Sequence, residues 1–312
     1  MSQTITYKGK VSEPSAMPQK ENVISINKTD YYIFRPRRGN KGGNSWMLFL
    51  YSVEEFESAE EEYPDPEYAM KINKYSIYDN KSLSKKRNKR FKEEIDALYD
   101  CKESSYVIDI VEDGIIKDND GSYLYYIMEA AEYDLKSYLE NKPQLNKSDR
   151  LSICFKLTQA IADLFKNNYY HRDIKPDNFL LTYSGIWKIG DLGLVSERNI
   201  ENDLDDEQEF IGPRGWTTPE TMNKYLTKKK DIRFDRFIDE KSDMFQLGMV
   251  FWYIMQGNAP IGCVMDYNFL PQDHHLYIYI RTMLSYSKSL RPKDFESILK
   301  RLEYFANKAL FE

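Results

Sequence analysis

A run of eight residues holds most of the side chains that could do chemistry: His171-Arg172-Asp173-Ile174-Lys175-Pro176-Asp177-Asn178. Eighteen residues after Asp173 (191 − 173) begins a second run, Asp191-Leu192-Gly193. Asp173 could accept a proton from a hydroxyl, Lys175 could bind a phosphate, and the amide of Asn178 and the carboxylate of Asp191 suit Mg²⁺. Phosphoryl transfer needs such a set, because its loose transition state leaves the protein mainly positioning and charge neutralisation to perform.

Strands are expected to dominate the first 130 residues. Tyr31–Phe34 and Trp46–Val53 flank a glycine-containing turn, which predicts a hairpin. Phe91, Ile95 and Leu98 recur at helical spacing and predict one helix over Arg87–Tyr99. Further strands are predicted at Tyr68–Ile72, Tyr106–Val111 and Leu124–Met128.

Beyond Ala131 the pattern becomes helical. Asn146, with Asp149 three residues later, predicts the start of a helix with an apolar stripe. Phe245–Met255 is apolar on nearly all sides and predicts a buried helix. At the other end of the chain, residues 1–28 are polar without periodicity and predict a flexible tail.

Over about residues 30–310 the sequence resembles the eukaryotic-type (Hanks-type) protein kinase family. The resemblance implies an α+β, bilobal fold, with a β-sheet N-terminal lobe at 29–129 and a mainly helical C-terminal lobe at 130–312. It also implies ATP with Mg²⁺ or Mn²⁺ as cofactors, and a protein as substrate.

The other landmarks of the family appear in the expected order. Lys71 resembles the lysine on the α- and β-phosphates, and Glu94 its ion-pair partner. Asp173 and Lys175 match the catalytic residues, and Asn178 and Asp191 the metal ligands. By the same resemblance, the nucleotide-binding residues are Gly42, Gly43, Met47, Ala69, Lys71, Glu129, Ala131, Asp134 and Leu180.

Four further residues resemble architectural positions of the family. Asp243 matches a buried helix aspartate that anchors the catalytic loop, and Arg291 matches the arginine that pairs with Glu220. His171 is expected to pack beneath Asp191 without moving protons.

The glycine-rich loop departs from the family pattern. Asn40 and Ser45 stand at the first and third glycine positions, while Gly42 keeps the middle one. Backbone N–H groups remain available for phosphates, so we expect nucleotide binding to survive. Leu192 replaces a phenylalanine and can fill the same apolar slot.

Two features conflict over the acceptor. The pattern from Pro213 to Glu220, with Trp216 and Thr217 inside it, resembles that of tyrosine kinases. Lys175, in contrast, is the serine/threonine-kinase feature and is expected to contact the transferred phosphate. We favour serine/threonine and keep a tyrosine or dual-specificity kinase as an alternative. An ATP-binding pseudokinase scaffold is a second alternative. A small-molecule kinase of the aminoglycoside or choline type is less favoured, since Glu220 with Arg291 indicates a protein substrate.

The segment between Glu197 and Trp216 contains no Ser, Thr or Tyr. One hypothesis is that an acid of this segment pairs with Arg172 and makes the enzyme constitutively active; the alternative is a solvated loop. The candidate acids are Glu197, Glu201, Asp203, Asp205, Asp206, Glu207 and Glu209.

Composition limits the other classes of function. A net charge of −6 gives no basic field for nucleic acid or an anionic membrane. Three dispersed cysteines fit a reducing compartment, and the longest apolar run, Met249–Met255, is too short to span a bilayer, so a cytoplasmic protein is expected. Charged stretches at 54–67, 81–92 and 227–236 are most simply solvated faces, or else docking sites for a regulator.

Overall fold

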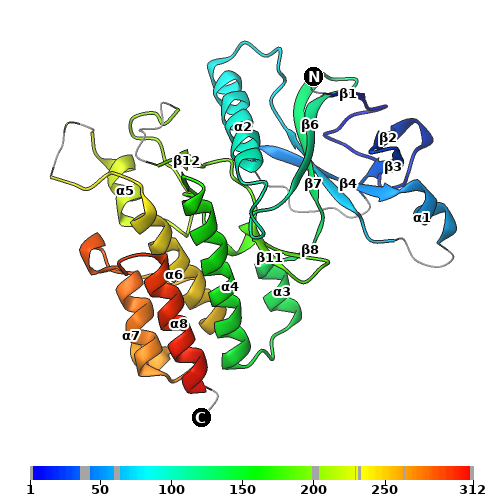
Figure 1. Ribbon diagram of the computed structural model, residues 1–312. Coiled ribbons are helices and arrows are strands. Elements are labelled where there is room, and N and C mark those ends of the chain that lie inside the picture. The colour runs from blue at the N-terminus through cyan, green and yellow to red at the C-terminus, as the bar shows by residue number, and fades with distance from the viewer. Residues whose placement is uncertain are drawn as a thin grey trace. The chain divides into compact units, whose positions relative to one another are not determined.

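The computed structural model describes residues 3–35, 43–59, 64–198, 204–228, 230, 233–262 and 264–309. The chain forms two compact units. The first comprises Met1–Lys102 and Ile108–Ala131, and the second Glu103–Val107 and Glu132–Glu312 (Figure 1).

The first unit is built on a seven-stranded sheet in the order β1-β6-β7-β5-β4-β3-β2. Neighbouring strands are antiparallel except β1, which runs parallel to β6. The predicted β3–β4 hairpin is confirmed. The strands are β1 (Gln3–Thr6), β2 (Val23–Ile26), β3 (Thr29–Phe34), β4 (Ser45–Ser52), β5 (Tyr68–Asn73), β6 (Ile110–Lys117) and β7 (Ser122–Glu129).

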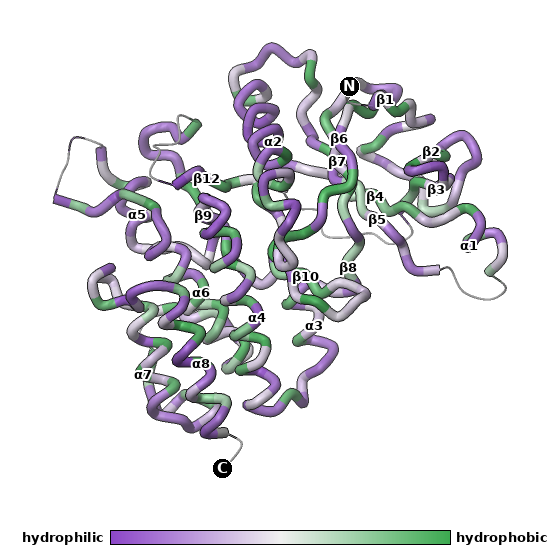
Figure 2. Tube along the Cα trace, viewed as in Figure 1, coloured by the Kyte–Doolittle hydropathy of each residue, from purple (hydrophilic) through white to green (hydrophobic). Residues whose placement is uncertain are grey.

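Alternation along β5 gives the two faces of the sheet different tasks. Lys71 points toward α2 (Ser82–Asp100), where it meets Glu94, and α2 also packs Phe91 against Tyr126 of β7, with ring centroids 5.5 Å apart. Met70 and Ile72 point to the opposite face because successive side chains of a strand alternate. Most of α2 is hydrophilic in Figure 2, and its buried side includes the apolar residues Phe91, Ile95, Ala97 and Leu98.

Residues 3–28 are not the flexible tail that their composition predicts. Ile5, Tyr7 and Val11 are buried against the face of the sheet that carries Met70 and Ile72. The chain there also forms β1 and β2, with Asn27 and Lys28 in the left-handed region at the tight turn into β3. The segment becomes ordered because its few apolar side chains pack on a sheet face formed by residues distant in the sequence.

Two other details of this unit differ from the sequence prediction. The strand expected at Tyr106–Val111 is β6, which begins only at Ile110. The acidic stretch opens with a short helix, α1 (Val53–Ser58), whose first turn is capped by the Ser52 hydroxyl. Phe56 of α1 packs on Tyr32 and Phe34, so part of the stretch belongs to the core.

The second unit is mainly helical, with a three-stranded sheet in the order β11-β10-β8 and a two-stranded one of β12 and β9. Asn146 caps α4 by accepting the N–H of Asp149 at 2.8 Å, as predicted. The helices are α3 (Leu135–Asn141), α4 (Lys147–Lys166), α5 (Pro219–Leu226), α6 (Glu240–Gln256), α7 (His274–Met283) and α8 (Phe295–Ala309). The strands are β8 (Ala131–Asp134), β9 (Tyr169–Tyr170), β10 (Phe179–Thr182), β11 (Trp187–Ile189) and β12 (Ser196–Glu197).

Helix α6 is the centre of this unit. Almost all of its residues are buried, which confirms the predicted buried helix, and it packs against α4 and α7. Asp239 and Ser242 form a reciprocal capping box at its start, and Gly257 ends it with a φ of +82°. The α+β fold class is confirmed. Within the described ranges, every helix is too short or too polar to span a lipid bilayer.

Candidate active site

In the first unit, an ion pair joins β5 to α2. Lys71 Nζ lies 2.6 Å from Glu94 Oε1, and the Tyr126 hydroxyl donates to the same oxygen at 2.9 Å. All three side chains are buried, so the low local polarity strengthens their interaction and fixes the lysine in one position.

The nucleotide-binding residues expected in the first unit surround the same strand. Met47 of β4 is paired with Lys71 in the sheet register. Ala69, two residues before Lys71 on β5, is buried. Glu129 ends β7, and its carboxylate accepts the N–H of Asp109 at 2.9 Å. Gly43 has a φ of +75°, and Gly42 lies outside the described residues.

In the second unit, the side chains of the catalytic loop, residues 171–178, converge on one carboxylate. Asp173 Oδ2 accepts from Lys175 Nζ at 2.8 Å and from Asn178 Nδ2 at 2.9 Å. Burial raises the pKa of Asp173 against the opposing effect of Lys175. Burial also lowers the pKa of Lys175, but the Asp173 and Asp191 carboxylates outweigh it, so the net pKa lies above its ordinary value.

Asn178 and Asp191 stand on two segments held together by their backbones. The Gly190 N–H, next to Asp191, donates to the Asn178 carbonyl at 2.9 Å. Asn178 uses its Nδ2 as a donor to Asp173, which leaves the amide oxygen Oδ1 as an acceptor. An amide oxygen and a carboxylate suit Mg²⁺, which usually takes one or two carboxylates plus substrate phosphates. The described residues contain no cluster of three or more His, Cys, Asp and Glu suited to a metal.

Leu180, Ala131 and Asp134 complete the expected residues, and Ala131 begins β8. Leu180 lies half-buried in β10, two residues after Asn178. Asp134 caps α3 by accepting the N–H of Ser137 at 2.8 Å, so it has a structural task in addition to any contact with a nucleotide.

Asp243 of α6 holds the backbone that precedes Asp173. Its carboxylate accepts the N–H groups of His171 and Arg172 at 2.8 and 2.9 Å. Arg172 has a φ of +68°, a left-handed conformation that costs a non-glycine residue about 1–2 kcal/mol. Complete burial raises the pKa of Asp243 to about 7, against the opposing effect of the two backbone bonds.

His171 links Asp173 to the segment before Asp191. Its Nδ1 accepts the Asp173 N–H at 3.2 Å, so the proton of the neutral ring lies on Nε2 and is donated to the Gly190 carbonyl, also at 3.2 Å. Complete burial lowers the pKa of His171 from 6.5 to about 4. The ring is therefore neutral at physiological pH and acts as a spacer.

We expect His171 to remain neutral in the folded protein until the pH nears 4. Because its folded pKa lies below the unfolded value of 6.5, its stabilising effect is complete above pH 6.5 and is lost as pH falls toward 4. The loss should total about 3 kcal/mol. Ring NMR spectra can test this, since the chain has three histidines and His171→Gln identifies the signal. A His171 ring signal that titrates near pH 6.5 would contradict the expected neutral, buried ring.

Among the acids that the structure describes in the segment before Trp216, Asp205 is the one that pairs with Arg172, while Glu201 and Asp203 lie outside the described residues. Asp205 Oδ2 lies 2.6 Å from Arg172 Nη2 and 2.6 Å from Lys224 Nζ, with only 6% of the Asp205 side chain exposed. Lys224 comes from α5 and was not anticipated. A carboxylate therefore joins the catalytic loop to α5 at the point where Arg172 needs an anion.

A bidentate ion pair braces the end of the same segment. Arg291 Nη2 and Nη1 donate to the two carboxylate oxygens of Glu220 at 2.7 and 3.2 Å, and both side chains are buried. Ser242 also donates to Glu220, at 3.1 Å. The pair fixes the start of α5 against α6.

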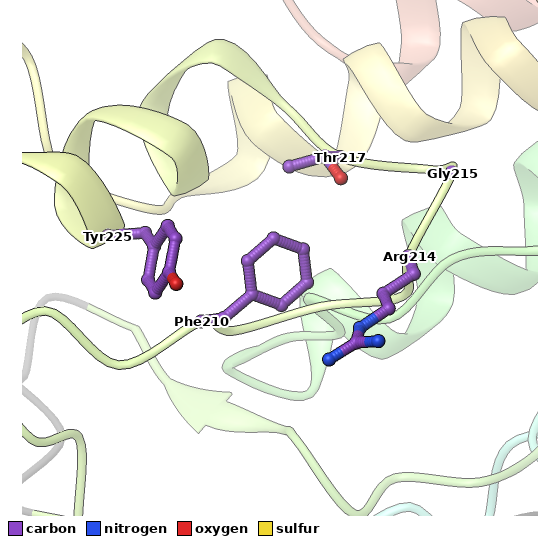
Figure 3. Close-up of a pocket in the computed structure, with 5 residues that line it drawn as sticks. All are labelled: Phe210, Arg214, Gly215, Thr217 and Tyr225. Atoms are coloured by element: carbon purple, nitrogen blue, oxygen red, sulfur yellow. The ribbon is translucent and has the colours of Figure 1, made fainter.

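A pocket of about 400 Å³ lies in the second unit, between this segment and α5. Figure 3 shows the rings of Phe210 and Tyr225 on one side of it and the Arg214 side chain on the other. The two rings meet edge to face, with centroids 5.5 Å apart. Gly215 and Thr217 complete the lining. No feature of the sequence alone indicated this pocket.

Comparison with known proteins agrees with this geometry. Residues 59–307 match the family model described as "Protein kinase domain". Mouse dual specificity protein kinase TTK is 23% identical over 144 residues, which cover 46% of this chain and 17% of that protein. Serine/threonine-protein kinase cds1 of Schizosaccharomyces pombe is 31% identical over 195 residues, which cover 62% of this chain and 40% of the relative.

A bacterial relative is similar over a comparable stretch. Serine/threonine-protein kinase PrkC of Bacillus subtilis is 28% identical over 137 residues, covering 44% of this chain and 19% of that protein. The chain thus spans less than half the length of each of these three relatives. The family model covers far more than half of the chain, and the buried Lys71–Glu94 and Glu220–Arg291 pairs stand where the family pattern requires them, so the chain belongs to the protein kinase family.

Proposed function

We propose that the protein transfers the γ-phosphate of ATP, with Mg²⁺ or Mn²⁺, to serine or threonine hydroxyls of a protein substrate. The observation that carries the proposal is the Asp173 carboxylate, held by Lys175 at 2.8 Å and by Asn178 at 2.9 Å. A carboxylate fixed in this way can accept a proton from a hydroxyl.

In the proposed reaction, the substrate hydroxyl gives its proton to Asp173 as its oxygen bonds to the γ-phosphorus. The bond between that phosphorus and the bridging oxygen of the β-phosphate breaks, and ADP leaves with the electron pair. Lys175 neutralises charge on the transferred group, and Lys71, fixed by Glu94, binds the α- and β-phosphates. These roles demand positioned charges and no covalent intermediate.

Asn178 and Asp191 are proposed to hold the metal ion through one amide and one carboxylate oxygen. When bound, the ion neutralises charge on the phosphate oxygens. The adenine and ribose contacts are proposed for Gly42, Gly43, Met47, Ala69, Glu129, Ala131, Asp134 and Leu180. The hinge of the catalytic domain is proposed at Glu129–Ala131.

Transfer of labelled phosphate from ATP to casein tests the function. Wild type should label the protein and Lys71→Met should not, because methionine fills the site without the ammonium that Glu94 positions. Phosphoamino-acid analysis should find phosphoserine or phosphothreonine. Phosphotyrosine would favour the alternative suggested by the buried Pro213, and ATP binding without transfer would favour a scaffold.

We further propose that Asp205 makes activity independent of phosphorylation. Its carboxylate already neutralises Arg172 and Lys224, the task that a phosphate performs in kinases with an arginine before the catalytic aspartate. Since Glu197 to Trp216 contains no Ser, Thr or Tyr, that segment offers no phosphate acceptor of its own.

Asp205→Asn is therefore expected to lower kcat by at least about tenfold, because Arg172 and Lys224 would lose the carboxylate that they share. Asp206→Asn is the control, since Asp206 is the exposed neighbouring acid. Treatment of the wild type with phosphatase should leave kcat unchanged. Equal activity of the two variants, or a large loss on phosphatase treatment, would contradict constitutive activity.

We also place the protein in the cytoplasm and expect any regulator to dock at the charged stretches. Lys81–Lys92 lies at the start of α2, the helix that carries Glu94. A partner that moved this helix would move Glu94 and so the Lys71 pair.

A further inference from the structure

Gln246 connects the catalytic loop to the segment that lines the pocket. It lies on α6 with 2% of its surface exposed. Its Oε1 accepts the Ile174 N–H at 3.1 Å, and its Nε2 donates to the Trp216 carbonyl at 3.0 Å. Ile174 directly follows Asp173, so one side-chain amide spans from the proposed base to Trp216.

The Ile174 N–H has no easy replacement for this amide. Ile174 is fully buried, so water does not reach its N–H, and a buried donor without a partner is unfavourable. Pro213, in the segment before Trp216, has neither an N–H nor a hydroxyl with which to form another link. Gln246 therefore satisfies a donor on one segment and an acceptor on the other.

The same two segments also touch without a side chain between them. Gly212 has a φ of +105°, and a Cβ added there would lie 3.3 Å from the Arg172 carbonyl oxygen. The backbone thus approaches the catalytic loop at Gly212, and the Gln246 amide holds it again at Trp216. Two such points fix the orientation of the chain between them.

The chain held in this way forms one wall of the pocket. Trp216 stands between Gly215 and Thr217, and both line the pocket that Figure 3 shows. Phe210 and Tyr225 form the opposite aromatic side. Displacement of the Trp216 carbonyl would move the wall at Gly215 and Thr217 relative to Asp173.

We propose that Gln246 is a positioning residue for the protein substrate. It sets the distance between Asp173 and the pocket that receives a side chain near the acceptor hydroxyl. The inference rests on the proposed function. It assigns to Gln246 an effect on the use of the protein substrate and none on the binding of ATP. Loss of the amide should weaken use of a protein or peptide and leave ATP binding unchanged.

The chain offers a matched control on the same helix. Gln256 also uses its amide twice on backbone, donating to the Asn268 carbonyl and accepting the Leu270 N–H at 2.8 Å. Gln246→Met and Gln256→Met therefore remove the same two kinds of bond from α6. Of the two glutamines, only Gln246 bonds to the catalytic loop.

The test measures KM for casein and for ATP in both variants. Gln246→Met should raise the KM for casein at least fivefold, with the KM for ATP unchanged, and Gln256→Met should change neither. A casein KM equal in the wild type and Gln246→Met, with the wild type active, would overturn the positioning role and leave the proposed function intact.

Hydrogen exchange gives a second readout that needs no activity. In Gln246→Met, the amide of Ile174 should exchange at least tenfold faster than in the wild type. Gln246→Glu, which is nearly isosteric, should keep that amide protected through its remaining acceptor while raising the casein KM. Unchanged exchange at Ile174 in Gln246→Met would overturn the inference even if the wild type proved inactive toward casein.

Discussion

Asp173→Asn is expected to lower kcat for phosphate transfer by about 10²–10⁴-fold, the range of a general base. Asparagine has nearly the same shape and can remain beside Lys175 and Asn178. Its amide, however, cannot take the proton of the attacking hydroxyl. ATP affinity should therefore stay near that of the wild type, and steady-state kinetics with a nucleotide-binding measurement would separate the two effects.

The control is Asp177→Asn in the same loop. Asp177 is exposed, whereas Asp173 is buried, so the same change of charge occurs without loss of the proposed base. Transfer by Asp177→Asn should stay close to wild type. Undiminished transfer by Asp173→Asn would rule out Asp173 as the base.

Arg291→Ala should lower the free energy of unfolding by about 3–5 kcal/mol, the typical cost of removing one partner of a buried ion pair. Arg291 is fully buried and forms two bonds to Glu220, so its removal leaves a carboxylate without its counter-charge. The guanidinium also lies 4.9 Å from the centre of the Phe245 ring, so packing is lost as well. Denaturant unfolding of the full chain measures the change.

Two comparisons identify the origin of that effect. Lys300 and Glu296 of α8 form an exposed pair 2.6 Å apart, and Lys300→Ala should leave the unfolding midpoint unchanged. The double variant Glu220→Ala/Arg291→Ala should lose less free energy of unfolding than the sum of the two single variants. The reason is that removing both side chains leaves no buried charge without its partner. Strict additivity would show that the pair acts through packing alone.

The sequence predicted best the features that depend on local pattern. Phe91, Ile95 and Leu98 predicted the helix that became α2, and the apolar run from Phe245 predicted the buried α6. The spacing of the family motifs anticipated that Lys71 would meet Glu94 and that Glu220 would meet Arg291. In each case, neighbouring residues or an ordered set of motifs carried the information.

Features that depend on distant contacts outside the family motifs could not be predicted. Seven acids precede Trp216, and their order gave no reason to choose Asp205, since its place depends on α5 and Lys224. Gln246 looked like any polar residue on a helix, because its two partners are backbone groups of other segments. The alternation of Ile24 and Ile26 was a weak signal for β2 that the polar surroundings concealed.

The strands before residue 59 lie outside the stretch that matches the family, which begins there. A shorter version of the chain cut at that boundary would lose β1 through β4. Met70, Ile72 and Tyr125 would be uncovered, and β5 and β6 would each gain a bare edge. Such a fragment would be prone to self-association through these edges, so the four strands before residue 59 protect the sheet that carries Lys71.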